Sequence, residues 1–181
     1  MRAMREISFR PLTLDDMQAM FLWLLRPHVA KWYAPKPASF AEAVAKYGPR
    51  TLPGSPVKAF VIAVDGADAG YIQSYPLAEF PDYAARIGSE AGAAGIDLFI
   101  GEEHLLGWGL GAGAVRKFVD ELAFADPATV ACYAGPLEGN AAATRTFAKA
   151  GFTPWKVVVN ERGENEQVMR RGKQGVRLLV P

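Results

Sequence analysis

The residues best suited to chemistry in this 181-residue chain lie in a glycine-rich stretch near its middle. Glycine occupies every second position there: Gly107, Gly109, Gly111 and Gly113. An apolar segment of strand length, residues 95–100, precedes the stretch. The apolar residues after it have helical spacing: Val115, Phe118, Val119 and Leu122. Glycine lets a backbone approach a ligand without a Cβ atom, and the first turn of a helix offers free N–H groups to an anion. Strand, loop and helix therefore predict a phosphate-binding site.

Two common phosphate loops do not fit this stretch. A P-loop ends in Gly-Lys-Ser/Thr, and no lysine follows Gly111 or Gly113. The dinucleotide pattern G-x-G-x-x-G places a glycine where this chain has Ala112, and no acidic residue ends a second strand about twenty residues further on. The phosphate therefore belongs to another class of ligand, unless the glycines form only a structural turn.

Composition limits the classes of protein that remain. Half of the residues are apolar and the net charge is +1, which predicts one globular domain spanning 1–181 and disfavours nucleic acid as a partner. No window approaches roughly eighteen uninterrupted apolar residues, so no membrane span is expected. The single cysteine, Cys132, fits a reducing cytoplasm, and the absence of CxxC and HExxH patterns predicts no metal site.

Periodicity and turn residues predict the order β-α-α-β-β-β-α-β-α-β with one further strand at the end. The expected strands are residues 7–11, 57–64, 69–75, 95–100, 129–133, 152–160 and 167–171. Four helices are expected: one capped by Thr13 and ending near residue 26, one over 40–47 capped by Ser39, one from the glycine loop to about Phe124, and one over 140–149 ended by Gly151. Residues 76–94 read as a long irregular loop, and residues 174–181 as a tail or an added edge strand.

Two motifs in this order resemble those of the Gcn5-related N-acetyltransferases, the GNAT superfamily. Residues 106–111 are similar to its pyrophosphate loop, Arg/Gln-x-x-Gly-x-Gly/Ala: Gly109 and Gly111 match, and Leu106 stands where Arg or Gln is common. Residues 140–152 resemble N-x-x-A-x-x-x-Y/F-x-x-x-G-F. The resemblance implies an α/β (α+β) fold with a mixed sheet of six to seven strands, splayed central strands and four helices. It also implies acetyl-CoA as cosubstrate and no metal.

The same resemblance implies which residues contact acetyl-CoA. The loop would bind the pyrophosphate through backbone N–H groups of Leu106, Gly107, Trp108, Gly109, Leu110, Gly111 and Ala112. The backbone of Leu98, Phe99 and Ile100 would pair with the pantetheine arm, which Asn140 would also contact. Phe147 stands where many members carry a tyrosine whose hydroxyl protonates the leaving thiolate. Tyr133 or water could replace it, and a thiol with a pKa near ~8.5 can also leave without full protonation.

The acceptor is expected to be cationic. Between Glu79 and Glu103 there is one base, Arg86, and there are six acids: Glu79, Asp82, Glu90, Asp97, Glu102 and Glu103. Carboxylates attract a polycation, although a solvated acidic loop would have the same composition. Asp97 interrupts the apolar strand and could accept the proton that an alkylammonium must lose before its nitrogen attacks. The alternative is an aspartate satisfied at a strand end.

A narrower resemblance points to aminoglycoside 6'-N-acetyltransferases of the AAC(6')-Ib type. Its motifs are Trp23-Leu24-x-Arg26-x-His28-Val29-x-x-Trp32-Tyr33, Gly70-Tyr71-x-Gln73-Ser74-Tyr75 and Gly95-Ile96-Asp97. It implies an acceptor site lined by Trp32, Tyr33, Gln73, Tyr75 and Asp97, to which Glu79 and Asp82 are added from the acidic stretch; Trp23 is expected in the core. One departure is Gly135, because this group carries an aspartate before the proline that corresponds to Pro136.

The resemblance, together with these residues, implies three alternative functions. The first is direct acetyl transfer to the 6'-amine of an aminoglycoside antibiotic by a cytoplasmic monomer or homodimer, which confers resistance. The second is acetylation of another amine, such as a hydroxamate-siderophore precursor, a polyamine or a peptide N-terminus. The third is a non-catalytic acetyl-CoA-binding module, which the missing hydroxyl at Phe147 favours.

Overall fold

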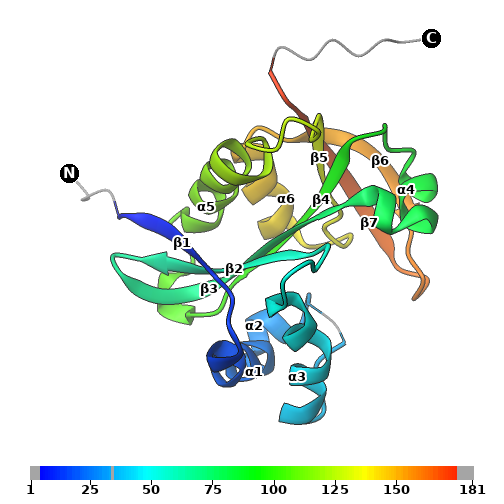
Figure 1. Ribbon diagram of the computed structural model, residues 1–181. Coiled ribbons are helices and arrows are strands. Elements are labelled where there is room, and N and C mark those ends of the chain that lie inside the picture. Colours follow the sequence, from blue (N-terminus) through cyan, green and yellow to red (C-terminus); the bar gives the residue numbers. More distant parts are fainter. Residues whose placement is uncertain (1–4, 34, 175–181) are drawn as a thin grey trace. The chain divides into compact units, whose positions relative to one another are not determined.

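A computed structural model describes residues 5–33 and 35–174 of the chain, and it confirms an α+β fold with a mixed sheet (Figure 1). Its strands are β1 (Ile7–Pro11), β2 (Lys58–Val64), β3 (Ala67–Pro76), β4 (Ala93–Ile100), β5 (Ala131–Ala134), β6 (Thr153–Val159) and β7 (Asn165–Gly172). Its α-helices are α1 (Met17–Leu25), α2 (Pro27–Ala30), α3 (Phe40–Tyr47), α4 (Pro81–Ile87), α5 (Leu110–Phe118) and α6 (Ala141–Lys149). The strand order in the sheet is β1-β2-β3-β4-β5-β7-β6.

The chain divides into two compact units. The first contains the residues up to Ser74 together with Asp97–Ala114, and the second contains Tyr75–Ile96 and the residues from Val115 onwards. The strands β3 and β4 and the helix α5 each contribute residues to both units.

In the first unit, β1, β2 and β3 form an antiparallel ribbon, and α1, α2 and α3 gather together (Figure 1). The turn between β2 and β3 is Asp65–Gly66, and both residues have positive φ (51° and 81°), as a tight hairpin turn requires. The three helices pack on one face of the sheet in an apolar core that includes Met20, Tyr71 and Phe99. This core fixes the part of β4 that carries Asp97.

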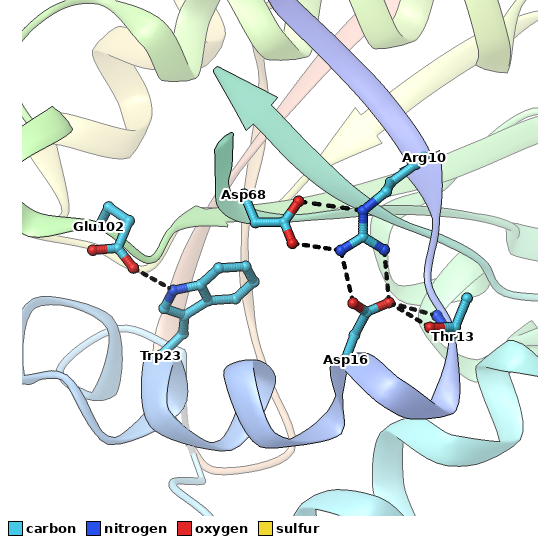
Figure 2. Close-up of polar contacts among 6 residues, drawn as sticks. All are labelled: Arg10, Thr13, Asp16, Trp23, Asp68 and Glu102. Atoms are coloured by element: carbon cyan, nitrogen blue, oxygen red, sulfur yellow. Dashed lines mark hydrogen bonds and ion pairs between the residues drawn. The ribbon is translucent and has the colours of Figure 1, made fainter. Parts of the chain in front are cut away.

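Polar contacts tie the start of α1 to the sheet (Figure 2). Arg10 on β1 donates two hydrogen bonds to Asp16, at 2.7 and 2.9 Å, and two to Asp68 on β3, at 2.5 and 3.2 Å. The backbone N–H and the hydroxyl of Thr13 also donate to Asp16. Thr13 is the N-cap of the 3₁₀ turn Leu14–Asp16, which runs directly into α1, and it forms a capping box with Asp16, so its expected position at the start of this helix is confirmed. Partial burial raises the pKa of Asp16, but the hydrogen bonds from Arg10 and Thr13 outweigh it and hold this pKa below its ordinary value of 3.8.

In the second unit, β4 pairs in parallel with β5, and β7 pairs antiparallel with both β5 and β6. The core under this part of the sheet includes Leu77, Ile87 and Val168. The helix α6 ends as expected at Gly151, where φ is 93° and the N–H of Phe152 donates back to the carbonyl of Phe147 at 3.0 Å. The hydrogen bond at Gly151 therefore fixes the end of α6, the helix that follows β5.

Several expectations from the sequence were wrong in detail. Residues 76–94 are not an irregular loop: they hold a 3₁₀ turn, Leu77–Glu79, and the helix α4, which Pro81 begins and a left-handed Gly88 ends. With α2, the described part of the chain holds six α-helices where four were expected. Leu122 is 37% exposed, because the continuation of α5 is a π-helical turn, Val119–Ala123. The expected tail lies outside the described residues, apart from its first residue.

No helix in the described ranges has both the length and the apolar character that a membrane crossing would need.

Replacing Arg10 by Met should lower the free energy of unfolding by about 1–2 kcal/mol at neutral pH, because two carboxylates lose charged hydrogen bonds. Because the pKa of Asp16 is lowered in the folded state, its contribution to the free energy of unfolding is complete above about pH 3.8. This contribution is lost as the pH falls through the folded-state pKa. Urea unfolding at about pH 7 and at about pH 3 should therefore show a wild-type advantage that shrinks in acid. Arg5→Met, which removes a surface ion pair with Asp65, is the control and should change little at either pH. An advantage that is equal at both pH values would contradict this account.

Candidate active site

The glycine loop has the backbone conformation that a close ligand contact requires. Gly107 and Gly109 both have φ of 78°, and a Cβ atom added at either position would meet no described atom within 4 Å. The helix α5 begins directly afterwards, and its first bond to the loop runs from the N–H of Gly113 to the carbonyl of Gly109 at 3.2 Å. The N–H groups at the start of the helix have no acceptor within the helix itself, so they suit an anion.

The side chains around this loop hold its backbone in place. Leu105 and Leu110 are buried and pack with Val64 and Ala69. Trp108 is 46% exposed, and the guanidinium carbon of Arg5 lies 4.9 Å from its ring centre. The buried leucines anchor the loop, and its glycine-rich backbone is exposed. The main-chain groups of the loop are therefore the ones that can contact a ligand.

Asp97 lies half-buried on β4 and is held by a neighbour on β3. The side-chain amide of Gln73, which is 5% exposed, donates to Oδ2 of Asp97 at 2.7 Å. The amide oxygen of Gln73 accepts a hydrogen bond from the hydroxyl of Tyr71 at 2.5 Å and another from Arg50. Two predicted site residues, Gln73 and Asp97, are thus directly bonded, as part of a longer polar chain that includes Tyr71 and Arg50.

Aromatic rings surround this polar chain. Tyr33 meets Phe99 edge-on with ring centres 5.0 Å apart, and Phe99 stacks on Tyr71 at 5.5 Å. Burial raises the pKa of Tyr33 well above 10, with a further contribution from the charge of Asp97, and burial raises the pKa of Tyr47 to about 12. These hydroxyls therefore stay neutral at physiological pH. Trp32, also predicted for the acceptor site, is half-buried with the ammonium of Lys31 4.7 Å from its ring centre.

The end of β4 is fastened to α1 and α2. The indole N–H of Trp23 donates to Glu102 at 2.9 Å (Figure 2), and Arg26 contacts the same carboxylate at 3.3 Å. A ring nitrogen of His28 lies 2.9 Å from the carbonyl oxygen of Ile100. Trp23 is 4% exposed, so its expected core position is confirmed. The carboxylate of Glu102 therefore joins the end of β4 to Trp23 and Arg26.

The remaining predicted acceptor residues lie in the second unit. Tyr75 is half-buried, lies edge-on to Phe80 at 4.9 Å, and crosses Gly95 so closely that a Cβ atom there would come within 2.3 Å of its ring. Glu79 and Asp82 are exposed. Tyr75 thus has a fixed packing position, whereas the two acids project from the surface of a turn and a helix.

Two predicted cofactor residues also lie in this unit, on and beside α6. The side-chain oxygen of Asn140 accepts the N–H of Ala143 at 3.1 Å and caps the helix. Phe147 is buried and meets Phe152 edge-on at 5.2 Å. The structure therefore gives both residues a structural role in addition to the one that the resemblance implies.

Tyr133, the alternative proton donor, is committed to another partner. It is 1% exposed and its hydroxyl donates to Glu90, which also accepts a 3.0 Å hydrogen bond from Nε of Arg170. Burial and the bond to Glu90 raise the pKa of Tyr133, so its proton is held more tightly than in free tyrosine. Glu90 and Glu102 are paired with cations inside their units, so the acidic excess in the sequence overstates the charge available to a ligand.

A carboxylate from another strand occupies the place beside Gly135. A Cβ atom added to Gly135 would lie 2.7 Å from Oε2 of Glu166 on β7 and 2.8 Å from the hydroxyl of Tyr83 on α4. That hydroxyl donates to Glu166 at 3.2 Å. The place of Glu166 beside Gly135 could not be predicted from the sequence, because it depends on the pairing of β7 with the loop after β5. Arg50 was not predicted as a site residue either, because it stands alone in a stretch rich in glycine and proline.

Comparison with known proteins places these features in a family. A family model described as an acetyltransferase (GNAT) domain matches residues 13–159. Two relatives named aminoglycoside N(6')-acetyltransferase type 1, from Klebsiella pneumoniae and Serratia marcescens, are each 31% identical over 148 residues, which is 81% of this chain and 73% of theirs.

Solved structures agree with this comparison. The crystal structure of AAC(6')-Ib in complex with coenzyme A and kanamycin has a TM-score of 0.79 and 29% sequence identity, and covers 93% of this chain and 96% of that one. The structure of AAC(6')-Ib with paromomycin and acetyl-CoA has the same TM-score at 28% identity, covering 93% and 94%. The match to the domain model over most of the chain, with these relatives and the glycine loop before α5, shows that the chain belongs to the GNAT acetyltransferase family.

Proposed function

We propose that this GNAT acetyltransferase transfers the acetyl group of acetyl-CoA directly to an amine of a polycationic acceptor, the 6'-amine of an aminoglycoside. The observation that carries the proposal is the carboxylate of Asp97, held at 2.7 Å by the buried amide of Gln73 on the strand before the glycine loop. Support comes from the names of the 31%-identical relatives and from the kanamycin and paromomycin complexes of AAC(6')-Ib.

The residues present fit acetyl-CoA, which supplies the activated acetyl group. Gly107 and Gly109 leave open the space that a Cβ atom would fill, and the N–H groups at the start of α5 suit the negative charge of a pyrophosphate. Leu106, Trp108, Leu110, Gly111 and Ala112 complete this loop. We assign Leu98, Phe99 and Ile100 to the pantetheine arm through their backbone groups, and we also assign Asn140 and Phe147 to cofactor binding, as the resemblance implies.

Asp97 has the chemistry that the acceptor amine needs. An alkylammonium with a pKa near ~10.4 must lose a proton before its nitrogen can attack, and a fixed carboxylate can orient the ammonium and receive that proton. Gln73 keeps the carboxylate in one orientation, and Tyr33 and Trp32 provide aromatic walls. The thiolate leaves without a tyrosine donor in this proposal, because Phe147 has no hydroxyl and Tyr133 is bonded to Glu90.

Glu166 provides a second carboxylate for the acceptor, together with Tyr75, Glu79 and Asp82. In the group that this chain resembles, an aspartate precedes the proline after the fifth strand, and Gly135 lacks that side chain. Oε2 of Glu166 lies 2.7 Å from the point where a Cβ atom of residue 135 would be. We therefore assign the binding of one acceptor ammonium to Glu166, oriented by the hydroxyl of Tyr83.

The test of the function is release of free thiol from acetyl-CoA with a panel of acceptors: kanamycin, tobramycin, amikacin, spermidine, lysine and N6-hydroxylysine. We expect rapid release with the aminoglycosides, and mass spectrometry of the product should place the acetyl group on the 6'-amine. Release with spermidine, lysine or N6-hydroxylysine alone would reassign the acceptor. No release, with acetyl-CoA still bound, would favour a binding module lacking a proton donor at Phe147.

The same assay tests the role of the Asp97 carboxylate by substitution. Asp97→Asn should lower turnover at least about tenfold and leave the affinity for acetyl-CoA unchanged, because it removes the proton acceptor alone. Asp15→Asn, at an exposed aspartate on the turn before α1, should have wild-type rates. Equal rates for Asp97→Asn and wild type would remove Asp97 from the mechanism.

Gly109→Val should weaken acetyl-CoA binding at least about tenfold, since a branched side chain would stand where the pyrophosphate approaches the backbone. Isothermal titration calorimetry gives the affinity directly. Gly163→Val is a matched control: its φ of 77° imposes the same backbone strain and its surroundings are equally open, but it lies in the turn between β6 and β7. Equal losses in the two variants would show that strain, and not the ligand, causes the effect.

Glu166→Gln should raise the KM for an aminoglycoside about tenfold with little change in kcat, because it removes a charged contact with an acceptor ammonium. The matched control is Glu164→Gln, two residues earlier, whose carboxylate pairs with Arg162 in the hairpin turn. Steady-state kinetics with kanamycin compares the two. A KM for Glu166→Gln within twofold of wild type would exclude Glu166 from the acceptor site.

A further inference from the structure

Arg50 lies outside the strands of the candidate site but reaches into its polar chain. It belongs to the 3₁₀ turn Gly48–Thr51 after α3 and is half-buried. Its Nη1 donates to the hydroxyl of Tyr71 at 2.9 Å and also to the amide oxygen of Gln73. Its guanidinium carbon lies 4.4 Å from the ring centre of Tyr47. A long charged side chain placed this far inside a unit needs a reason beyond surface solvation.

The groups on both sides of the Gln73 amide require its nitrogen to face Asp97, because the carboxylate only accepts hydrogen bonds and the guanidinium of Arg50 only donates them. A glutamine amide can be reversed by a half turn, which exchanges an oxygen that accepts for a nitrogen that donates. A guanidinium donates and never accepts, so only the oxygen of Gln73 can face Arg50. The nitrogen must then face Asp97, where it donates to Oδ2 at 2.7 Å. Tyr71 alone would not settle the matter, because a hydroxyl can either donate or accept.

We propose that Arg50 is a positioning residue: it fixes the amide of Gln73 so that its N–H group holds the carboxylate of Asp97 in the orientation that receives the acceptor amine. The inference rests on the role proposed above for Asp97. Without Arg50, the amide oxygen of Gln73 loses its charged donor, so the plane of the amide is less restrained and the carboxylate that its N–H group holds loses its single orientation. Arg50 acts only through Gln73 and touches no reacting atom.

A purely structural role for Arg50 makes different predictions. Its contact with Tyr47 stabilises the helix α3 against the core, and loss of that contact would weaken folding alone. A purely structural effect would lower the free energy of unfolding and leave the kcat of the folded enzyme unchanged in either background. A positioning effect that passes through Gln73 must vanish once the amide is absent, because residues that act as one chain are not additive.

The first experiment is a double-mutant cycle with kanamycin as acceptor. Arg50→Met should lower kcat about ten- to a hundredfold while the affinity for acetyl-CoA stays within twofold of wild type. In a Gln73→Leu background the same substitution should lower kcat less than twofold. Arg162→Met in the turn between β6 and β7 is the control for loss of an arginine and should keep wild-type kcat. An equal loss of kcat in both backgrounds, or no loss in either, would overturn the proposal.

Arg50→Lys covers the case in which the methionine variant does not fold. Lysine keeps a donor and the positive charge, so this variant should recover at least half of the lost activity. Thermal unfolding of each variant separates poor folding from poor catalysis. A folded lysine variant with activity as low as that of Gln73→Leu would contradict an effect based on donation to the amide oxygen.

A second experiment is independent of the acceptor. In ¹⁵N-labelled protein, the side-chain amide protons of Gln73 are identified by their absence in Gln73→Leu. One of these two protons bonds to a carboxylate, so their chemical shifts should differ widely in the wild type. In Arg50→Met the difference between the two chemical shifts should become smaller. An unchanged pair would overturn the positioning role even if the enzyme acetylates none of the acceptors tested. If only the proposed function is wrong, the wild-type protein will acetylate none of the acceptors, but the chemical shifts of the Gln73 amide protons will still change in Arg50→Met.

Discussion

A carboxylate inside an apolar strand must find hydrogen-bond donors, and this constraint organises the first unit. Asp97 interrupts β4, and the amide of Gln73 meets it at 2.7 Å. That amide exposes an oxygen that must itself be satisfied, which requires the hydroxyl of Tyr71 and the guanidinium of Arg50. Each of these groups would be unfavourable to bury alone, so the chain is stable only when it is complete. One acidic residue thus accounts for the polar chain of Gln73, Tyr71 and Arg50 in this unit.

The glycine loop depends on a second constraint at the end of the same strand. Glu102 accepts from the indole of Trp23 and from Arg26, and a Cβ atom at Gly101 would come within 2.3 Å of the Trp23 ring. The strand can therefore end flush against α1 only because residue 101 is glycine. A rigid strand end holds the loop that follows, so Gly107 and Gly109 have a fixed starting point. Preorganisation of this kind lowers the entropy that binding must overcome.

Local chemistry explains what could be predicted from the sequence. The caps at Thr13 and Ser39 and the glycine-rich turn before α5 are decided by neighbouring residues, and each could be predicted. The helix α4 was missed because its seven residues are too few for an amphipathic pattern, although Pro81 and Gly88 mark both ends. The hydrogen bonds of Arg50 with Tyr71 and Gln73, and that of Glu166 with Tyr83, could not be predicted because these partners lie at least twenty residues apart in the sequence and meet only in the folded chain.

The charge of the site is likewise a property of the fold and not of a stretch of sequence. Between residues 79 and 103 the acids outnumber the bases, but Glu90 is paired with Arg170 and Glu102 with Arg26. Glu166 lies outside that stretch, and its carboxylate accepts a hydrogen bond from the phenol of Tyr83. A phenol orients a carboxylate without neutralising it, whereas a guanidinium does both. Asp97 accepts a hydrogen bond from an amide and Glu166 accepts one from a phenol, whereas Glu90 and Glu102 pair with guanidinium groups, so the local acidic excess does not mark the carboxylates that we assign to the acceptor.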